Sequence, residues 1–183
     1  RNLENGLWVW WNEDGKKNQE GNYRSGQQHG TWINYNEKGR KIEESQWKNG
    51  ELFGKTTLWD KNGNKTILKS FKEDEKDGLW IWWSPNGKKV KEGNFKLGDK
   101  NGKWTYYHAN GKKKRLENYK LGKKNGKLIV WFENGQKERE ESYKNDEKHG
   151  KWTYWFENGR LDKEEKYTNG VQTDGKHYDY FDN

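Results

Sequence analysis

The residues that could perform chemistry occur in this chain as members of a regular series. Glutamates recur in the second half of a 24-residue repeat, three positions before an aromatic side chain: Glu20, Glu44, Glu92, Glu140 and Glu164. A catalytic pair would be an exception to such a series, whereas lysines on neighbouring strands can pair with every member of it. The four histidines have no metal-ligand spacing, and the absence of cysteine excludes disulfides and thiolate metal sites. No nucleophile–base arrangement or phosphate-binding loop is present. The sequence therefore predicts a protein that is not an enzyme and that has no cofactor or metal site.

The elements that carry these residues belong to a strict repeat. A glycine begins each unit at Gly6, Gly30, Gly54, Gly78, Gly102, Gly126 and Gly150, and an eighth, incomplete unit begins near Gly175 after one inserted residue. A second series of glycines lies nine residues behind the first, from Gly15 to Gly159. Such a period identifies a repeat array, in which function usually belongs to a surface built by several repeats. We expect residues 1–183 to form a single repeat domain of seven hairpin units and a C-terminal half-unit.

One unit shows the expected local structure. Residues 103–108 are rich in Trp, Tyr and Thr, and residues 113–120 carry Leu116 and Tyr119, so both segments are typical of strands. Asn110-Gly111 between them predicts a hairpin turn, because both residues tolerate positive φ. No apolar pattern with a helical period is found. We therefore predict an all-β fold, an elongated antiparallel β-meander or solenoid-like array of tandem 24-residue hairpins.

Composition limits the class of protein further. Only 27% of the residues are hydrophobic and 36% are charged, which would favour disorder, but 13 Trp, 10 Tyr and 6 Phe at fixed positions supply large buried surfaces instead. No apolar run is long enough to span a membrane. The net charge of +8 comes from mixed signs, so we expect only weak attraction to anionic lipid. Because the first residue, Arg1, is not methionine, the bacterial cytoplasm and an exported or cell-surface location both stay open.

The two faces of the first strand in each unit carry different side chains. The first face is the better candidate for the core: Val9/Trp11, Ile33/Tyr35, Thr57/Trp59, Ile81/Trp83, Thr105/Tyr107, Ile129/Trp131 and Thr153/Trp155. The second face is either another packed surface or an exposed aromatic stripe that binds a partner. Its members are the candidate partner-binding residues: Trp8, Trp10, Trp32, Trp80, Trp82, Trp104, Tyr106, Trp152 and Tyr154. The cross-strand register is not fixed by the sequence, since a slip of one residue exchanges the faces.

The repeat resembles the MORN repeat family, and more closely the bacterial MORN-variant repeats of YwqK-type antitoxin proteins. The residues that carry the resemblance are Gly102, Trp104, Tyr107, Asn110, Gly111, Tyr119, Gly122 and Gly126, with Gly150, Trp152, Trp155, Asn158 and Gly159 in a later unit. Thr56 and Leu128 depart from the pattern, since each replaces its tryptophan. The resemblance implies a β-repeat scaffold without an active site, with roles in protein interaction, tethering and phospholipid contact. The antitoxin branch implies a toxin as the partner.

These observations favour a non-enzymatic scaffold that binds another protein, in the manner of a bacterial antitoxin or immunity protein. The alternative is an exported or cell-surface module whose exposed rings contact a glycan, a host molecule or lipid. A third hypothesis, an electrostatic binder of nucleic acid or anionic membrane, is less favoured because acidic residues alternate with basic ones in every unit. Such binding would be weak and lost as salt rises, so no specific nucleic-acid partner is expected.

Overall fold

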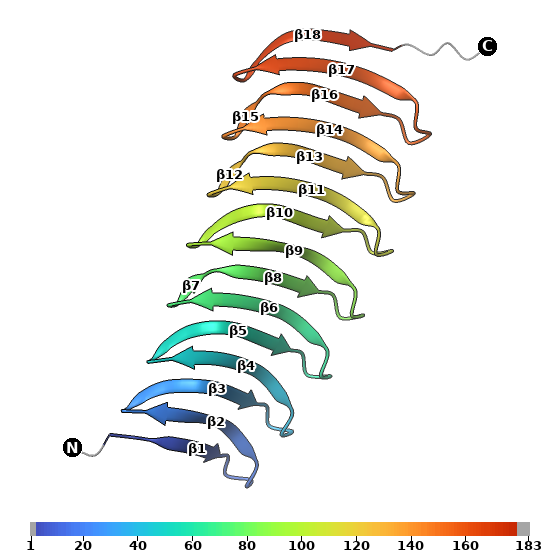
Figure 1. The fold of residues 1–183 in the computed structure, drawn as a ribbon. Coiled ribbons are helices and arrows are strands. Elements are labelled where there is room, and N and C mark those ends of the chain that lie inside the picture. Colours follow the sequence, from blue (N-terminus) through green and yellow to red (C-terminus); the bar gives the residue numbers. More distant parts are fainter. Residues whose placement is uncertain (1–2, 179–183) are drawn as a thin grey trace. The chain divides into compact units, whose positions relative to one another are not determined.

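The computed structural model describes residues 3–178, which fall into two compact units. The first contains the chain up to Lys89 and Phe95–Gly98, and the second contains Val90–Asn94 and the chain from Asp99 onward. Among the described residues there are strands and turns and no helix, and sequential strands pair antiparallel within each unit (Figure 1). The all-β class and the array of hairpins are confirmed. The single domain stays a prediction, and Arg1, Asn2 and residues 179–183 at the end of the half-unit lie outside the described residues.

The strand bounds follow the repeat. In the first unit they are β1 (Gly6–Trp11), β2 (Lys17–Arg24), β3 (Gln27–Tyr35), β4 (Lys41–Lys48), β5 (Glu51–Trp59), β6 (Lys65–Lys72), β7 (Glu75–Lys76) and β8 (Gly78–Trp83). Strand β9 (Lys89–Lys96) has residues in both units. In the second unit they are β10 (Asp99–Tyr107), β11 (Lys113–Lys120), β12 (Lys123–Lys124), β13 (Gly126–Trp131), β14 (Lys137–Lys144), β15 (Glu147–Lys148), β16 (Gly150–Trp155), β17 (Leu161–Thr168) and β18 (Val171–His177).

The turn with two left-handed residues lies at the opposite end of each hairpin from the Asn-Gly turn, where the sequence suggested it. At the Asn-Gly turn only the glycine is left-handed (Gly111, φ +88°), and Asn110 accepts a hydrogen bond from the amide of Lys112 at 2.8 Å. At the other turn both central residues are left-handed, as in Leu121 (φ +47°) and Gly122 (φ +79°). This is the tight two-residue hairpin with positive φ at both positions, which we had expected at Asn-Gly.

The C-terminal half-unit departs from the expected alignment. Gly175 lies within β18 and pairs with Glu165. The residue equivalent to Glu165 in the first repeat is Gly21, and Gly21 pairs with Trp32. Gly175 also lacks the positive φ of the glycines that begin the seven preceding units. It therefore takes the place of a repeat tryptophan rather than that of a unit glycine.

The core lies on the face that we had not expected. The most buried rings are the tryptophans two residues after the unit glycine: Trp32 is 3% exposed, Trp80 7%, Trp104 2% and Trp152 4%. On the other face Ile81 and Thr153 are buried, but Trp11 is 59% exposed and the remaining members of that series are half-buried. The prediction that the Val9/Trp11 series forms the core is therefore wrong. A uniform β-branched series indicated good strand-forming residues, but not which side of the single-layered sheet the large rings would cover.

Each buried tryptophan joins its own strand to the preceding one. The indole N–H of Trp104 donates to the backbone oxygen of Asn94 at 3.0 Å, a residue ten positions earlier in the chain. The same bond recurs as Trp32 to Asn22, Trp80 to Ser70 and Trp152 to Ser142, at 3.0–3.1 Å. Because a buried indole N–H needs an acceptor, the bond fixes where each ring lies across its neighbour.

Glycine on the neighbouring strand makes room for two of these rings. A Cβ built on Gly93 would lie 2.2 Å from the ring of Trp104, and one on Gly21 would lie 2.2 Å from the ring of Trp32. Neither glycine has positive φ, so neither is needed for a special backbone conformation. Their role is the close approach of an aromatic ring to the backbone.

The opposite face is organised by charge. Glu140 contacts Lys127 across the strand pair at 2.5 Å and Lys137 on its own strand at 2.6 Å. Glu164 and Lys151 form the same cross-strand pair at 2.5 Å. The prediction that these glutamates pair with lysines across strands is confirmed for Glu140 and Glu164. Glu20 and Glu44 instead pair with lysines of their own strands, Lys17 and Lys41.

Substitution of Gly93 tests the ring-on-glycine contact. We expect Gly93→Ala to lower the free energy of unfolding by about 1–3 kcal/mol, the usual cost of an overpacked core. Asn94→Ala is the control, since Trp104 uses only the backbone oxygen of Asn94, and should change stability by less than about 0.5 kcal/mol. Urea unfolding followed by tryptophan fluorescence measures both. Equal stability of the two variants would contradict the contact.

The ion pairs on the opposite face predict that stability depends on pH. Hydrogen bonds from Lys127 and Lys137 lower the pKa of Glu140 below its usual value of 4.5. A lowered folded-state pKa favours the folded state above pH 4.5, and this contribution is lost as pH falls through the lowered value. Wild type should therefore lose stability on acidification more steeply than Glu140→Gln in urea titrations at a series of pH values. If the free energy of unfolding fell equally for both proteins on acidification, these ion pairs would contribute nothing to stability.

Candidate partner-binding face

We use the name aromatic face for the sheet surface that carries the buried tryptophans and the aromatic residue of each second strand. In the second unit it consists of Trp104, Tyr106, Tyr119, Leu128, Val130, Tyr143, Trp152, Tyr154 and Tyr167, which the strand register places on one side. Trp152 lies between Tyr143 and Tyr167, with ring centroids 5.2 and 5.0 Å apart. The rings of β14, β16 and β17 therefore form one row within this unit.

In the first unit the same face is built more heavily from tryptophan. Trp32 packs on Trp10 at 5.5 Å and on Tyr23 at 5.1 Å between ring centroids. Further along, Trp80 contacts Phe71, Trp82 and Phe95 at 5.1–5.6 Å. Offset and edge-to-face contacts of this kind add to the free energy gained by burial alone.

The nine candidate partner-binding residues fall into two groups. Four of them are core residues: Trp32, Trp80, Trp104 and Trp152. The exposed stripe that we considered is therefore wrong for these four, because the indole of each is covered and hydrogen-bonded. The others are accessible to different extents: Trp8 is 41% exposed, and Trp10, Trp82, Tyr106 and Tyr154 are half-buried. Binding of a partner by these accessible rings stays a prediction.

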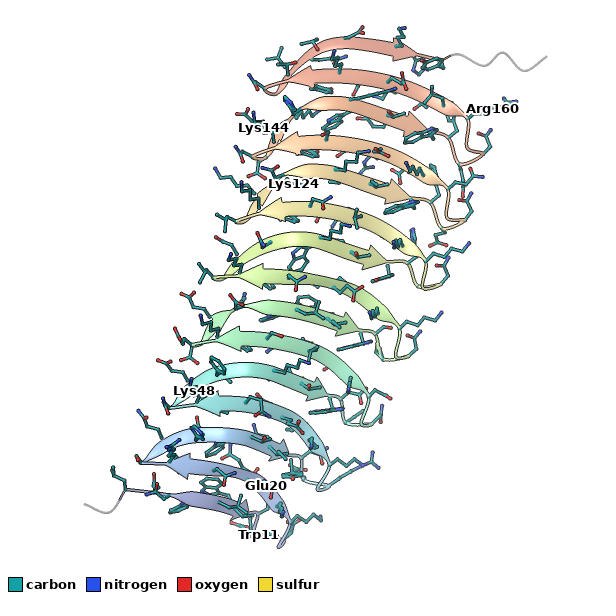
Figure 2. All side chains as sticks on the ribbon, viewed as in Figure 1. Trp11, Glu20, Lys48, Lys124, Lys144 and Arg160 are labelled. Atoms are coloured by element: carbon teal, nitrogen blue, oxygen red, sulfur yellow. The ribbon has the colours of Figure 1, made fainter. Side chains whose placement is uncertain are left out.

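A row of lysines lies on the aromatic face, and sequence reasoning missed it. The ammonium group of Lys100 is 4.5 Å from the ring centroid of Trp104 and 4.7 Å from that of Tyr119. Lys148 lies in the same way at 4.3 Å from Trp152 and 4.5 Å from Tyr167. Lys124, labelled in Figure 2 near the two-residue turn, is 5.0 Å from Tyr143, and in the first unit Lys76 is 5.4 Å from Trp80. The signal was present, since these lysines are spaced by 24 residues.

Three consecutive second strands of the second unit also carry a carboxylate on this face. Glu117 and Glu141 are buried, and Glu165 is half-buried. The tyrosine two residues later donates its hydroxyl to each: Tyr119 to Glu117 at 2.9 Å, Tyr143 to Glu141 at 2.8 Å and Tyr167 to Glu165 at 3.1 Å. A cation two residues earlier completes each group, namely Arg115, Arg139 and Lys163. The equivalent positions in the first repeats hold Gly21, Ser45 and Lys69, so this arrangement belongs to the second unit.

Burial of these groups changes their acid–base behaviour. Burial, together with the hydrogen bond to Glu117, raises the pKa of Tyr119 well above its usual range, and Tyr143 is raised in the same way beside Glu141. Burial also lowers the pKa of Lys100. The tyrosines therefore stay protonated as hydroxyl donors at neutral pH. Each carboxylate in turn holds a cation beside it, namely Arg115, Arg139 or Lys163.

Residues 3–178 contain no group of three or more histidine, aspartate or glutamate side chains close enough to hold a metal ion. The described residues also include no helix of the length and apolar character that crossing a bilayer requires.

Comparison with known families identifies the repeat. A model of the family described as MORN repeat variant matches residues 4–25, 76–97, 100–121, 124–145 and 148–169, which is more than half of the chain. The chain belongs to the MORN repeat family. MORN repeats are typically protein- or membrane-binding modules and non-catalytic scaffolds. The match is to the repeat family as a whole, and membership of the antitoxin branch stays a prediction.

Other comparisons add little to the MORN assignment. No curated protein matches the chain. Among solved structures, a chain of the GtfA/B complex bound to UDP and GlcNAc is similar with 12% identity and a TM-score of 0.27. That match covers 58% of this chain and 21% of the other, and a likeness this low supports no argument about function.

The tyrosine–glutamate contacts can be tested by removing one hydroxyl. We expect Tyr119→Phe to lower the free energy of unfolding by about 1.5–3 kcal/mol, because a hydrogen bond to a buried charge is lost while the ring is kept. Tyr23→Phe is the matched control, since Tyr23 occupies the same repeat position beside Gly21 rather than a carboxylate. A double-mutant cycle with Glu117→Gln should show coupling between the two residues. Additive losses would mean that the hydroxyl does not stabilise Glu117.

Proposed function

We propose that this chain is a non-enzymatic scaffold that binds a protein partner through its aromatic face. The observation that carries the proposal is the contrast within that face between buried and accessible rings. The deepest rings, such as Trp104, hold the strands together, while Tyr106 and Tyr154 in the same unit are half-buried. A surface with fixed rings that are still accessible loses little conformational entropy when a partner covers them.

The spacing of the accessible groups supports a partner that is itself a macromolecule. Equivalent residues in successive units are two strands apart, or about 10 Å at the usual strand separation. Each unit therefore contributes only one small contact area, and several units together are needed for an interface of ordinary size. Trp, Tyr and Arg, which dominate the binding energy of protein interfaces, are the residues that this face presents.

The finer form of the proposal concerns the kind of partner. The resemblance to bacterial antitoxin-type repeats suggests a toxin, which the chain would cover without chemical modification. The lysine row on the aromatic face supports a partner with an acidic contact surface, since Lys100 and Lys148 add positive charge beside the rings. Contact with anionic lipid or a glycan is the alternative, and it makes a different prediction about salt, because a lipid contact built on charge alone weakens steeply as salt rises.

The test compares two pairs of tryptophans on the same strands. Trp10 and Trp82 lie on the aromatic face, and their immediate neighbours Trp11 and Trp83 lie on the opposite face of β1 and β8. A partner captured at physiological salt is purified, and its affinity is measured with wild type, Trp10→Ala/Trp82→Ala and Trp11→Ala/Trp83→Ala. We expect the first double variant to bind at least about tenfold more weakly, in the range of interface hot spots, and the second to bind like wild type.

Both double variants must first unfold cooperatively at similar temperatures, so that a loss of affinity reports on the surface. Equal affinity for all three proteins, or a loss confined to Trp11→Ala/Trp83→Ala, would contradict binding by the aromatic face. Capture of anionic vesicles instead of a protein, lost with added salt, would replace the protein partner by a membrane.

A further inference from the structure

Arg115 and Arg139 occupy the same repeat position but have different sets of partners. Arg139 contacts two carboxylates, with Nη1 2.6 Å from Oε1 of Glu138 and Nε 2.9 Å from Oε1 of Glu141. Arg115 has Lys114 where Arg139 has Glu138. Its Nε lies 3.4 Å from Oε1 of Glu117, and this buried nitrogen has no hydrogen-bond partner among the described residues.

The guanidinium of Arg115 is nevertheless held in place. Its central carbon lies 4.3 Å from the ring centroid of Tyr106, and Glu117, its ion-pair partner, is fixed in turn by the hydroxyl of Tyr119. A guanidinium has five N–H donors, and the partners of Arg115 in this structure are Glu117 and Tyr106. The side chain is therefore preorganised but has fewer acceptors than the equivalent side chain one repeat later.

A groove of about 430 Å³ lies between the two arginines. It is lined by Tyr106, Lys114, Arg115, Val130, Glu138 and Arg139, among others. Lys114 and Glu138, the residues that differ between the two repeats, line the groove at a β-bulge. The strand register shifts after Tyr106 and after Val130, which leaves Lys114 and Glu138 as the extra, unpaired residues. The groove thus combines an apolar floor from a ring and a valine with one fully paired and one incompletely paired guanidinium.

From this comparison of two repeats we infer that the groove binds a carboxylate side chain, Asp or Glu, of the protein partner. The partner's carboxylate takes on Arg115 the place that Glu138 takes on Arg139, and Lys114 lies beside it as a second cation. The carbon chain of that residue covers Tyr106 and Val130. The inference rests on the proposed function, since it assigns one contact of the aromatic face.

The occupant is a carboxylate rather than a phosphate because of what already lies in the groove. The next repeat shows that a carboxylate fits this arrangement of bulge, arginine and buried glutamate. A phosphate carries up to two negative charges at neutral pH, and the carboxylate of Glu138 in the same groove repels it more strongly.

The direct test observes the N–H of the arginine itself. The probe is acetyl-Val-Glu-Val-amide, titrated into the ¹⁵N-labelled protein, and the control probe is the same peptide with Gln in place of Glu. We expect a saturable shift of the Nε–H resonance of Arg115 with the Glu peptide only, and no shift at Arg139. No saturable shift at Arg115, an equal response to the Gln peptide, or tighter binding of phenyl phosphate than of the Glu peptide would overturn the inference.

Two substitutions exchange the number of carboxylates beside the two arginines. Lys114→Glu supplies the missing carboxylate from within the chain, so it should weaken the Glu peptide at least about tenfold while the thermal unfolding midpoint stays the same or rises. Glu138→Gln removes the second carboxylate from Arg139 and should create a response to the peptide there. A purely structural role for Arg115 predicts the rise in stability but no change in binding, and that result would overturn the assignment.

Failure of the groove contact can be told apart from failure of the proposed function. A partner that still binds Lys114→Glu at full affinity but is lost with Trp10→Ala/Trp82→Ala leaves the aromatic face as the interface and removes the groove as its contact. A partner unaffected by either variant contradicts the aromatic face, whatever the peptide titration shows.

Discussion

The fold depends on a tryptophan that lies across the strand before its own. The ring covers the neighbouring backbone, and the indole N–H donates to a carbonyl oxygen ten residues earlier, as Trp104 does to Asn94. This interaction provides what a single-layered sheet otherwise lacks, namely a large apolar group buried without a second layer of structure. It recurs at Trp32, Trp80 and Trp152, so four repeats are attached to the preceding strand through the same bond.

That constraint determines what the aromatic face can do. The rings that hold strands together are covered, whereas Trp8, the rings two residues further on and the lysines stacked on the face remain accessible. Since the first group fixes the second, the accessible groups are rigid and regularly spaced. The second unit adds buried and half-buried carboxylates that hold arginine and lysine in defined positions beside the rings. Stability and the proposed recognition of a partner therefore use adjacent members of the same rows.

Much of the fold could be predicted from the sequence, because a strict period reports the repeat and its hairpins directly. The choice of core face could not, because both faces carry large rings and strand periodicity alone does not distinguish them. One readable signal was glycine on the second strand, since Gly21 and Gly93 leave room for the rings of Trp32 and Trp104. The lysine row was also readable, but charged residues in a repeat are usually solvent-exposed, and their stacking on aromatic rings depends on the register.

Hydrogen exchange at the indole N–H groups tests the central interaction most directly. ¹⁵N spectra resolve these protons for individual tryptophans. The indole protons of Trp32, Trp80, Trp104 and Trp152 should exchange only through unfolding of their repeats, whereas those of the exposed Trp8 and Trp11 should exchange at nearly the rate of free indole. Exchange of the first four as fast as Trp11 would contradict the account, because the rings would then not be bonded to the neighbouring strand.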